Sequence, residues 1–133
     1  MAAQGIHHLG VAVDDLDEAI STYERLFGAE LEERATQDEQ GVEAASLRVG
    51  PDHVELLTAL GPDTPVGRFL SRRGPGMHHV ALATGDLPAA VDRLEAAGAQ
   101  LVDRPRVGLF GVEFVFIHPD SVHGVLTEVV ASG

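Results

Sequence analysis

Two histidine pairs and two glutamates recur at similar distances along the chain. Each pair, His7-His8 and His78-His79, stands near the start of an apolar-rich segment. Glu55 follows His8 by 47 residues, and Glu128 follows His79 by 49 residues. Both glutamates have apolar, strand-like neighbours, where a carboxylate is costly unless it is paired with a charge or bound to a metal ion. If two copies of one unit pair about a pseudo-twofold axis, these histidines and glutamates converge.

A set of two imidazoles and two carboxylates suits one divalent metal ion. Borderline to hard divalent ions accept nitrogen and oxygen ligands in octahedral geometry, so four protein ligands leave two positions open for a substrate. The two carboxylates offset the charge of the ion, and the site then tolerates an anionic substrate. Because successive side chains of a strand point to opposite faces, only one histidine of each pair can face the site. The pattern itself does not choose between His7 and His8.

The elements that must position these residues come from an internal duplication. Residues 7–31 match residues 78–101 at an offset of 71 residues, with one slip near Phe27. The match places Asp15-Leu16 on Asp86-Leu87. A match of this length indicates a genuine repeat.

Each copy has the pattern of a strand, a helix and three further strands. Asp15 and Asp86 are predicted to cap the helices, and Gly28 and Gly98 to end them with positive φ. The expected helices are 15–27 and 86–97, and the expected strands are 6–13, 29–35, 42–49 and 53–60 in the first copy and 78–84, 99–103, 112–117 and 124–130 in the second.

We therefore expect one α+β domain over residues 1–133, built from two tandem βαβββ modules. The first module covers about residues 5–60 and the second about residues 77–131. A connector at about 61–76 holds a short helical turn at about 65–72.

Composition excludes several other chemistries. The chain has 133 residues, 21 acidic side chains against 9 basic ones and a formal net charge of −12. All basic residues are arginines and cysteine is absent, which excludes a thiolate nucleophile, a disulfide, a cysteine-bound zinc and a lysine Schiff base. The acidic balance argues against nucleic-acid binding, and no apolar run approaches the ~20 residues of a membrane span. The first five residues carry no basic side chain, so we expect no signal peptide and a cytoplasmic location.

Several stretches of the sequence resemble the vicinal oxygen chelate superfamily, and within it most closely the epimerases that act on methylmalonyl-CoA. The resemblance extends over essentially the whole chain. Its matching stretches are Ile6–Gly10, Glu39–Val42, Pro62–Leu70, Gly74–His79, Phe116–Pro119 and Gly124–Glu128. It implies a glyoxalase-like fold of paired βαβββ modules with a metal site between curved sheets, an acyl-CoA substrate and a homodimer.

By resemblance, the second histidine of each pair is a metal ligand. The implied ligands are His8, Glu55, His79 and Glu128, with cobalt, nickel, manganese or zinc as the ion. Some relatives carry glutamine where this chain has Glu55, and a carboxylate there also resembles glyoxalase I.

The resemblance also implies a reaction, the interconversion of (2R)- and (2S)-methylmalonyl-CoA through an enolate that the metal stabilises. Glu128 is the first candidate for the base. Its partner on the opposite face of the α-carbon is Glu55, a bound water or Glu43. Some relatives carry an acid–base glutamate where this chain has Ala44, and strand alternation is expected to turn Glu43 to the other face. Phe110 is a second departure, because it stands in a loop that is typically glycine-rich in relatives.

Four residues are candidate contacts for the substrate. Arg72 and Arg73 in the connector are predicted to bind the CoA phosphates, with Arg104 and Arg106 as alternatives. His118 and Ser121 precede the last strand and are expected to help place the substrate carboxylate.

Three other activities of the superfamily are alternatives. A glyoxalase I-type lactoylglutathione lyase uses the same ligand set on a glutathione hemithioacetal, so the ligands do not separate it from an epimerase. A fourth ligand argues against an extradiol dioxygenase, which holds iron with two histidines and one carboxylate. A metal-free antibiotic-binding protein has no need of four aligned ligands. The connector and the stretch from His118 to Val125 favour the CoA substrate.

Overall fold

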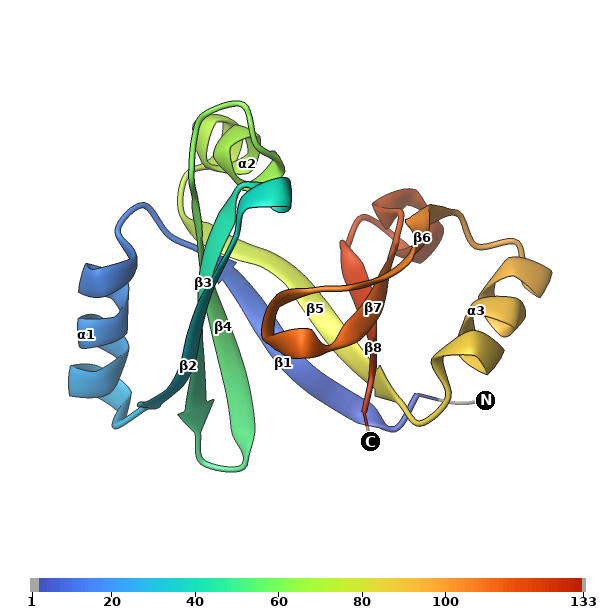
Figure 1. The fold of residues 1–133 in the computed structure, drawn as a ribbon, viewed down its shortest axis with the longest axis horizontal. Helices are drawn as coiled ribbons and strands as arrows, with labels where there is room; N and C mark the ends of the chain where they lie inside the picture. The colour runs from blue at the N-terminus through green and yellow to red at the C-terminus, as the bar shows by residue number, and fades with distance from the viewer. Residues whose placement is uncertain (1–2, 133) are drawn as a thin grey trace. The chain divides into compact units, whose positions relative to one another are not determined.

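The structure is a computed structural model that describes residues 3–132. Residues 1–2, part of the segment used to judge a signal peptide, lie outside this range, as does residue 133. Its helices are α1 (Leu16–Phe27), α2 (Pro65–Arg73) and α3 (Leu87–Ala96), and its strands are β1 (Gly5–Ala12), β2 (Glu30–Gln37), β3 (Val42–Val49), β4 (Asp52–Ala59), β5 (Gly76–Thr84), β6 (Leu101–Val107), β7 (Glu113–Ile117) and β8 (Thr127–Ala131) (Figure 1). Among the described residues, no helix combines the length and apolar character that crossing a membrane requires.

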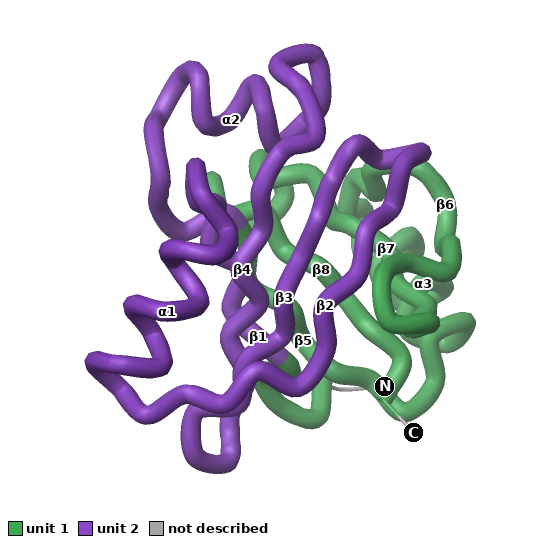
Figure 2. The backbone as a smooth tube through the Cα atoms, turned by 60° about the vertical axis from the view of Figure 1, so that its left-hand side comes forward, with its two compact units in different colours: residues 1–7, 79–133 green, residues 8–78 purple. Residues whose placement is uncertain are grey.

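The chain divides into two compact units (Figure 2). Among the described residues, the N-terminal unit comprises His8–His78, and the C-terminal unit comprises residues 3–7 and 79–132. The N-terminal unit has the strand order β2-β3-β4-β1, in which β1 and β4 are parallel and the other neighbours antiparallel. The C-terminal unit has the matching order β6-β7-β8-β5, with β5 and β8 parallel. The predicted pair of βαβββ modules is confirmed.

In the N-terminal unit, α1 forms because its sequence carries both a capping residue and one apolar face. The Asp15 carboxylate accepts a hydrogen bond from the Glu18 N–H at 3.0 Å. The helix ends at Gly28, whose φ of 65° favours glycine. The apolar face packs against one side of the sheet, and the buried residues of this core are Leu16, Ile20, Ala29, Ala45, Leu47 and Leu56. The other side of β1, β3 and β4 is therefore free of α1.

The C-terminal unit repeats this arrangement with α3. The Asp86 carboxylate accepts from the Ala89 N–H at 3.0 Å, and Gly98 has a φ of 85°. The core beneath α3 consists of Leu87, Ala90, Val115, Ile117 and Val129. Both predicted caps and both predicted glycine positions are thus confirmed.

Most elements lie within two residues of their predicted bounds, β6 and β8 differ by more, and the connector is a full helix rather than a short turn. The connector forms a full helix, α2, whose N-cap Thr64 accepts from the Gly67 N–H at 3.0 Å. Strand β8 begins at Thr127 rather than at 124, because His123 and Gly124 take φ values of 61° and 93° and turn the chain before it. Strand β6 extends to Val107 rather than ending at 103, and a register shift interrupts its pairing with β7 after Val102.

Candidate metal and substrate site

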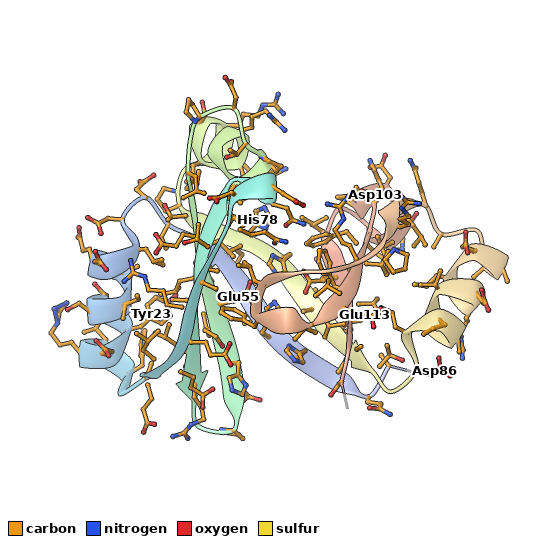
Figure 3. All side chains as sticks on the ribbon, in the orientation of Figure 1. Tyr23, Glu55, His78, Asp86, Asp103 and Glu113 are labelled. Atoms are coloured by element: carbon orange, nitrogen blue, oxygen red, sulfur yellow. The ribbon has the colours of Figure 1, made fainter. Side chains whose placement is uncertain are left out.

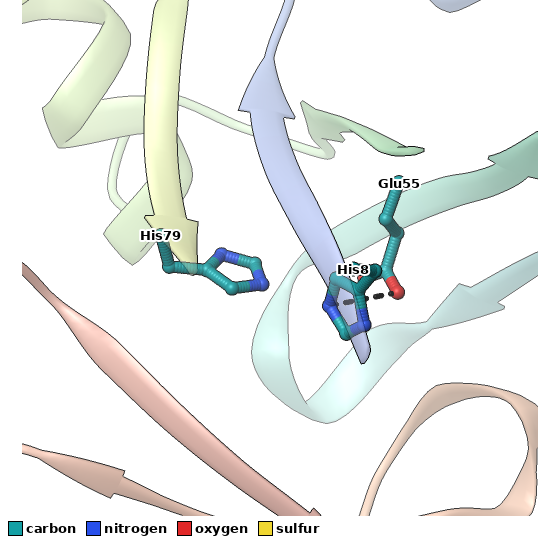
Figure 4. Close-up of side chains that lie close together, drawn as sticks. All are labelled: His8, Glu55 and His79. Atoms are coloured by element: carbon teal, nitrogen blue, oxygen red, sulfur yellow. Dashed lines mark ion pairs between the residues drawn. The ribbon is translucent and has the colours of Figure 1, made fainter. Parts of the chain in front are cut away.

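In the N-terminal unit, His8 and Glu55 occupy the face of the sheet that α1 leaves free. Leu56 belongs to the core beneath α1, so alternation along β4 turns its neighbour Glu55 to the opposite face. His8 is 5% exposed. Its Nε2 lies 3.4 Å from Glu55 Oε2 (Figure 4). The choice between His7 and His8, which the pattern leaves open, goes to His8 as the buried member of the pair.

In the C-terminal unit, the same construction brings His79 to Glu128. Val129 belongs to the core beneath α3, so Glu128 points to the other face. His79 Nε2 lies 3.9 Å from Glu128 Oε2, and the side chains are 3% and 13% exposed. The ring of Phe116, which stands opposite Glu128 in register, packs edge-to-face on His79 with centroids 5.6 Å apart. This contact orients the imidazole.

Burial changes the acidity of Glu55, which is labelled in Figure 3. Its side chain is only 14% exposed. Removal from water penalises the charged carboxylate and raises the pKa of Glu55 to about 7. A divalent ion beside the carboxylate favours the deprotonated form. The site therefore disfavours the carboxylate charge unless a cation accompanies it.

The distances between these donors fit a divalent ion. Two atoms held by one ion at about 2.1 Å lie about 3.0 Å apart when adjacent in an octahedron and about 4.2 Å apart when opposite. The histidine-to-glutamate separations of 3.4 Å and 3.9 Å lie in that range.

Glu43, the third candidate proton carrier, lies on a different face from Glu55. It stands opposite Thr58 in register. Its carboxylate accepts a hydrogen bond from Arg34 Nε at 2.9 Å, and Arg34 also pairs with Asp17 of α1. Glu43 thus lies on the α1 side of β3, as alternation predicts. The fully buried Ala44 occupies the Glu55 side.

The predicted phosphate-binding arginines lie in the last turn of α2. Arg72 and Arg73 are exposed, and a basic last turn is favourable beside the negative end of the helix dipole. The guanidinium of Arg73 lies over the ring of Phe69, 5.6 Å from its centroid. Of the alternative arginines, Arg106 forms an ion pair with Asp103.

His118 and Ser121 lie in the turn between β7 and β8. The Asp120 N–H donates to His118 Nδ1 at 3.1 Å, and the Gln100 N–H donates to Ser121 Oγ at 2.9 Å. Both predicted substrate contacts therefore also have a role in holding this turn.

Sequence reasoning missed the side chains that orient the histidine rings. Phe116 packs on His79, and Phe69 packs edge-to-face on His78 with centroids 5.0 Å apart. Burial, together with the charge of Arg73, lowers the pKa of His78. The alternation that places Glu128 on its face also places Phe116 there, so that signal was present in the sequence. No comparable local signal exists for the contact between α2 and His78.

Comparisons with known proteins identify relatives of this chain. Residues 7–116 match the model of the glyoxalase/bleomycin resistance protein/dioxygenase superfamily. The mitochondrial methylmalonyl-CoA epimerase of Dictyostelium discoideum is 34% identical over 125 residues, which cover 92% of this chain and 75% of that protein.

Solved structures show the same similarity. The crystal structure of methylmalonyl-CoA epimerase from Mycobacterium tuberculosis has a TM-score of 0.94 at 35% identity and covers 98% of this chain and 89% of that one. A variant of the Streptomyces coelicolor methylmalonyl-CoA epimerase, in complex with 2-nitronate-propionyl-CoA, has a TM-score of 0.93 at 34% identity and covers 99% of both chains. The fold of this chain is therefore shared with these two epimerases.

Proposed function

This chain belongs to the glyoxalase/bleomycin resistance protein/dioxygenase superfamily, and we propose that it interconverts (2R)- and (2S)-methylmalonyl-CoA. The observation that carries the proposal is similarity along nearly the full chain to methylmalonyl-CoA epimerases, in sequence and in structure. The buried histidine–glutamate pair in each unit supplies the chemistry that such a reaction needs.

The reaction requires a proton to leave the α-carbon from one face and another proton to return on the opposite face. The α-carbon lies between the thioester carbonyl and the carboxylate, so the electron pair released by the C–H bond is delocalised as an enolate. General acid–base catalysis by positioned side chains is worth about 10²–10⁴-fold in such a transfer.

The proposed metal ligands are His8, Glu55, His79 and Glu128. A bound divalent ion would act as a Lewis acid that stabilises negative charge on the substrate oxygens. The donor set accepts cobalt, nickel, manganese or zinc. Since all four side chains are at most 14% exposed, they would hold the acyl group away from bulk water.

Glu128 and Glu55 are the proposed proton carriers. In one direction, Glu128 would start as the carboxylate, take the α-proton on an Oε and become a neutral carboxylic acid. Glu55 would start that direction as the neutral acid, deliver its proton to the other face of the enolate and become the carboxylate. In the reverse direction the two exchange roles. Glu43 has no part in this proposal, because its carboxylate is engaged by Arg34 on the α1 side of β3.

Arg72 and Arg73 are the proposed contacts for the CoA phosphates. Both are exposed and carry positive charge on a chain whose formal net charge is −12. Arginine is well suited to bind phosphate because its planar guanidinium group can donate two parallel hydrogen bonds. These two residues would give a strongly anionic substrate a local point of attraction.

The direct test starts from one pure epimer of methylmalonyl-CoA. We expect the metal-loaded protein to convert either epimer into a mixture of both, and chelator-treated protein to lose this activity until cobalt, nickel, manganese or zinc is restored. Absence of conversion by metal-loaded protein refutes the proposal, and full activity after chelation refutes the metal requirement. Turnover of the methylglyoxal–glutathione hemithioacetal without turnover of the CoA ester would favour the glyoxalase alternative.

A further inference from the structure

The ring of His118 is held in a single tautomer by the backbone. The N–H of Asp120 donates to its Nδ1 at 3.1 Å. A backbone N–H can only donate, so Nδ1 must present a lone pair. A neutral imidazole carries one hydrogen on its two nitrogens, and in His118 that hydrogen is therefore on Nε2. Both contacts of this ring with described residues, the Asp120 N–H and the Asp120 carboxylate at 3.8 Å, are made by Nδ1.

The turn that contains His118 forms hydrogen bonds with the backbone of Gln100 at both of its ends. The His118 N–H donates to the Gln100 carbonyl at 2.7 Å, and the Gln100 N–H donates to Ser121 Oγ at 2.9 Å. The turn is also closed internally, since the Ser121 N–H donates to the His118 carbonyl at 3.0 Å. The ring is therefore held in a defined position.

Strand alternation places His118 on the same face of the C-terminal unit as Glu128. Phe116 stands opposite Glu128 in register, and His118 follows two residues later with an extended backbone, φ −58° and ψ 135°. Diagonal neighbours on one face of an antiparallel pair lie about 7–8 Å apart. The side chains of Glu128 and His118 therefore extend over the same part of this face, and the carboxylate of a substrate bound at Glu128 has the His118 ring as a neighbour. The ring is 37% exposed and open to a ligand.

We infer that His118 binds the free carboxylate of the acyl group by donating a hydrogen bond from Nε2–H, and that Ser121 and Gln100 position it for this role. The inference rests on the proposed function for the identity of the ligand. The tautomer itself rests on geometry alone. A neutral N–H that meets a carboxylate forms a charge-assisted hydrogen bond.

Two substitutions separate the donor from the turn. In His118→Asn, the amide oxygen occupies the place of Nδ1 and can still accept from the Asp120 N–H, but no donor remains at Nε2. In His118→Gln, the amide nitrogen occupies the place of Nε2 and can still donate, but the acceptor for the turn is lost. The probes are methylmalonyl-CoA at epimeric equilibrium and propionyl-CoA, which lacks the free carboxylate.

We expect His118→Asn to raise the Kd for methylmalonyl-CoA ~10-fold and to leave the Kd for propionyl-CoA unchanged. We expect His118→Gln to stay within about threefold of the wild type for methylmalonyl-CoA, because a neutral donor remains in place. A purely structural role would shift both ligands together. Equal changes for both ligands, or an unchanged Kd for methylmalonyl-CoA in His118→Asn, would overturn the inference.

A nitrogen-15 NMR spectrum of the metal-free protein tests the tautomer without any ligand. The result expected is a protonated Nε2 and an unprotonated Nδ1 for His118, and the reverse pattern overturns the inference. Failure of the proposed function is distinguishable, since the wild type would then convert neither epimer. If the wild type does convert the epimers while His118→Asn binds both esters normally, only the inference about His118 fails.

Discussion

The carboxylate of Glu55 is buried beside the imidazole of His8, and its neighbours along β4 are apolar. Its burial raises its pKa to about 7, above the ordinary value. The folded protein therefore holds a proton on Glu55 more tightly than the unfolded chain does. Stability from this group is fully present below the unfolded pKa and is lost as the pH rises through the folded pKa.

This sign leads to a prediction for the chelator-treated protein. Glu55→Gln removes the titration, so its free energy of unfolding relative to the wild type should increase as the pH rises from about 5 to 8. The total change is about 3 kcal/mol, from about 1.4 kcal/mol per pKa unit. Urea unfolding at a series of pH values measures it.

The matched control is Glu113→Gln, which removes an exposed carboxylate from β7. The difference in free energy of unfolding between Glu113→Gln and the wild type should vary much less over the same pH range. A Glu55→Gln difference that stays constant with pH would show that burial does not perturb this carboxylate.

Phe110 has a backbone conformation that is unusual for a residue other than glycine. Its φ of 63° lies in the left-handed region, which costs a residue with a Cβ about 1 kcal/mol or more. We expect Phe110→Gly to be more stable than Phe110→Ala by about 1 kcal/mol, although glycine is ordinarily the less stable of the two. Both variants lose the ring, so the comparison isolates the backbone. Thermal unfolding that ranks the alanine variant higher would contradict the strained conformation.

At the level of elements, α2 carries two positive charges at its exposed last turn. We predict that Arg72→Gln combined with Arg73→Gln raises the KM for methylmalonyl-CoA about five- to tenfold with little change in kcat, because surface contacts to phosphate are modest individually. Steady-state kinetics at constant ionic strength measures this.

A double variant of Arg25→Gln and Arg93→Gln provides the control. These arginines occupy the last turns of α1 and α3, so the variant makes the same change in net charge and in helix-dipole compensation. Its KM should remain close to that of the wild type. If both double variants raise KM equally, the effect is one of overall charge and α2 is not the phosphate contact.

The elements were predictable where their signals are local. Asp15 and Asp86 cap helices through a hydrogen bond to a residue three positions on, and apolar spacing defines the faces of α1 and α3. The start of β8 was predicted too early because His123 is a left-handed residue other than glycine, and residue type did not signal that conformation. The role of α2 also escaped prediction, because its packing of Phe69 on His78 depends on tertiary contacts.

Part of the candidate site was also predictable from patterns in the sequence. Alternation and duplication were enough to select both glutamates and to turn Glu43 away from Glu55. The pattern left His7 and His8 open; the family resemblance selected His8, and the burial along β1 agrees with that choice. The Nδ1 contact of His118 needed the folded turn, since its donor is a backbone amide.

At the level of the whole molecule, duplication explains why the ligands occur in matched sets. Each unit covers one face of its strands with a helix and places one histidine and one glutamate on the other face. A formal net charge of −12 opposes an anionic CoA ester at long range. Binding therefore depends on local groups, for which Arg72, Arg73 and His118 are the candidates.

The central claim is that this chain removes and returns the α-proton of methylmalonyl-CoA with Glu128 and Glu55. Its most direct test is the deuterium content of the α-carbon after metal-loaded protein and one pure epimer are incubated in D₂O. We expect deuterium at the α-carbon of both epimers, with exchange slowed about 10²–10⁴-fold in Glu128→Gln. Recovery of the ester without deuterium, or wild-type exchange in Glu128→Gln, would contradict it.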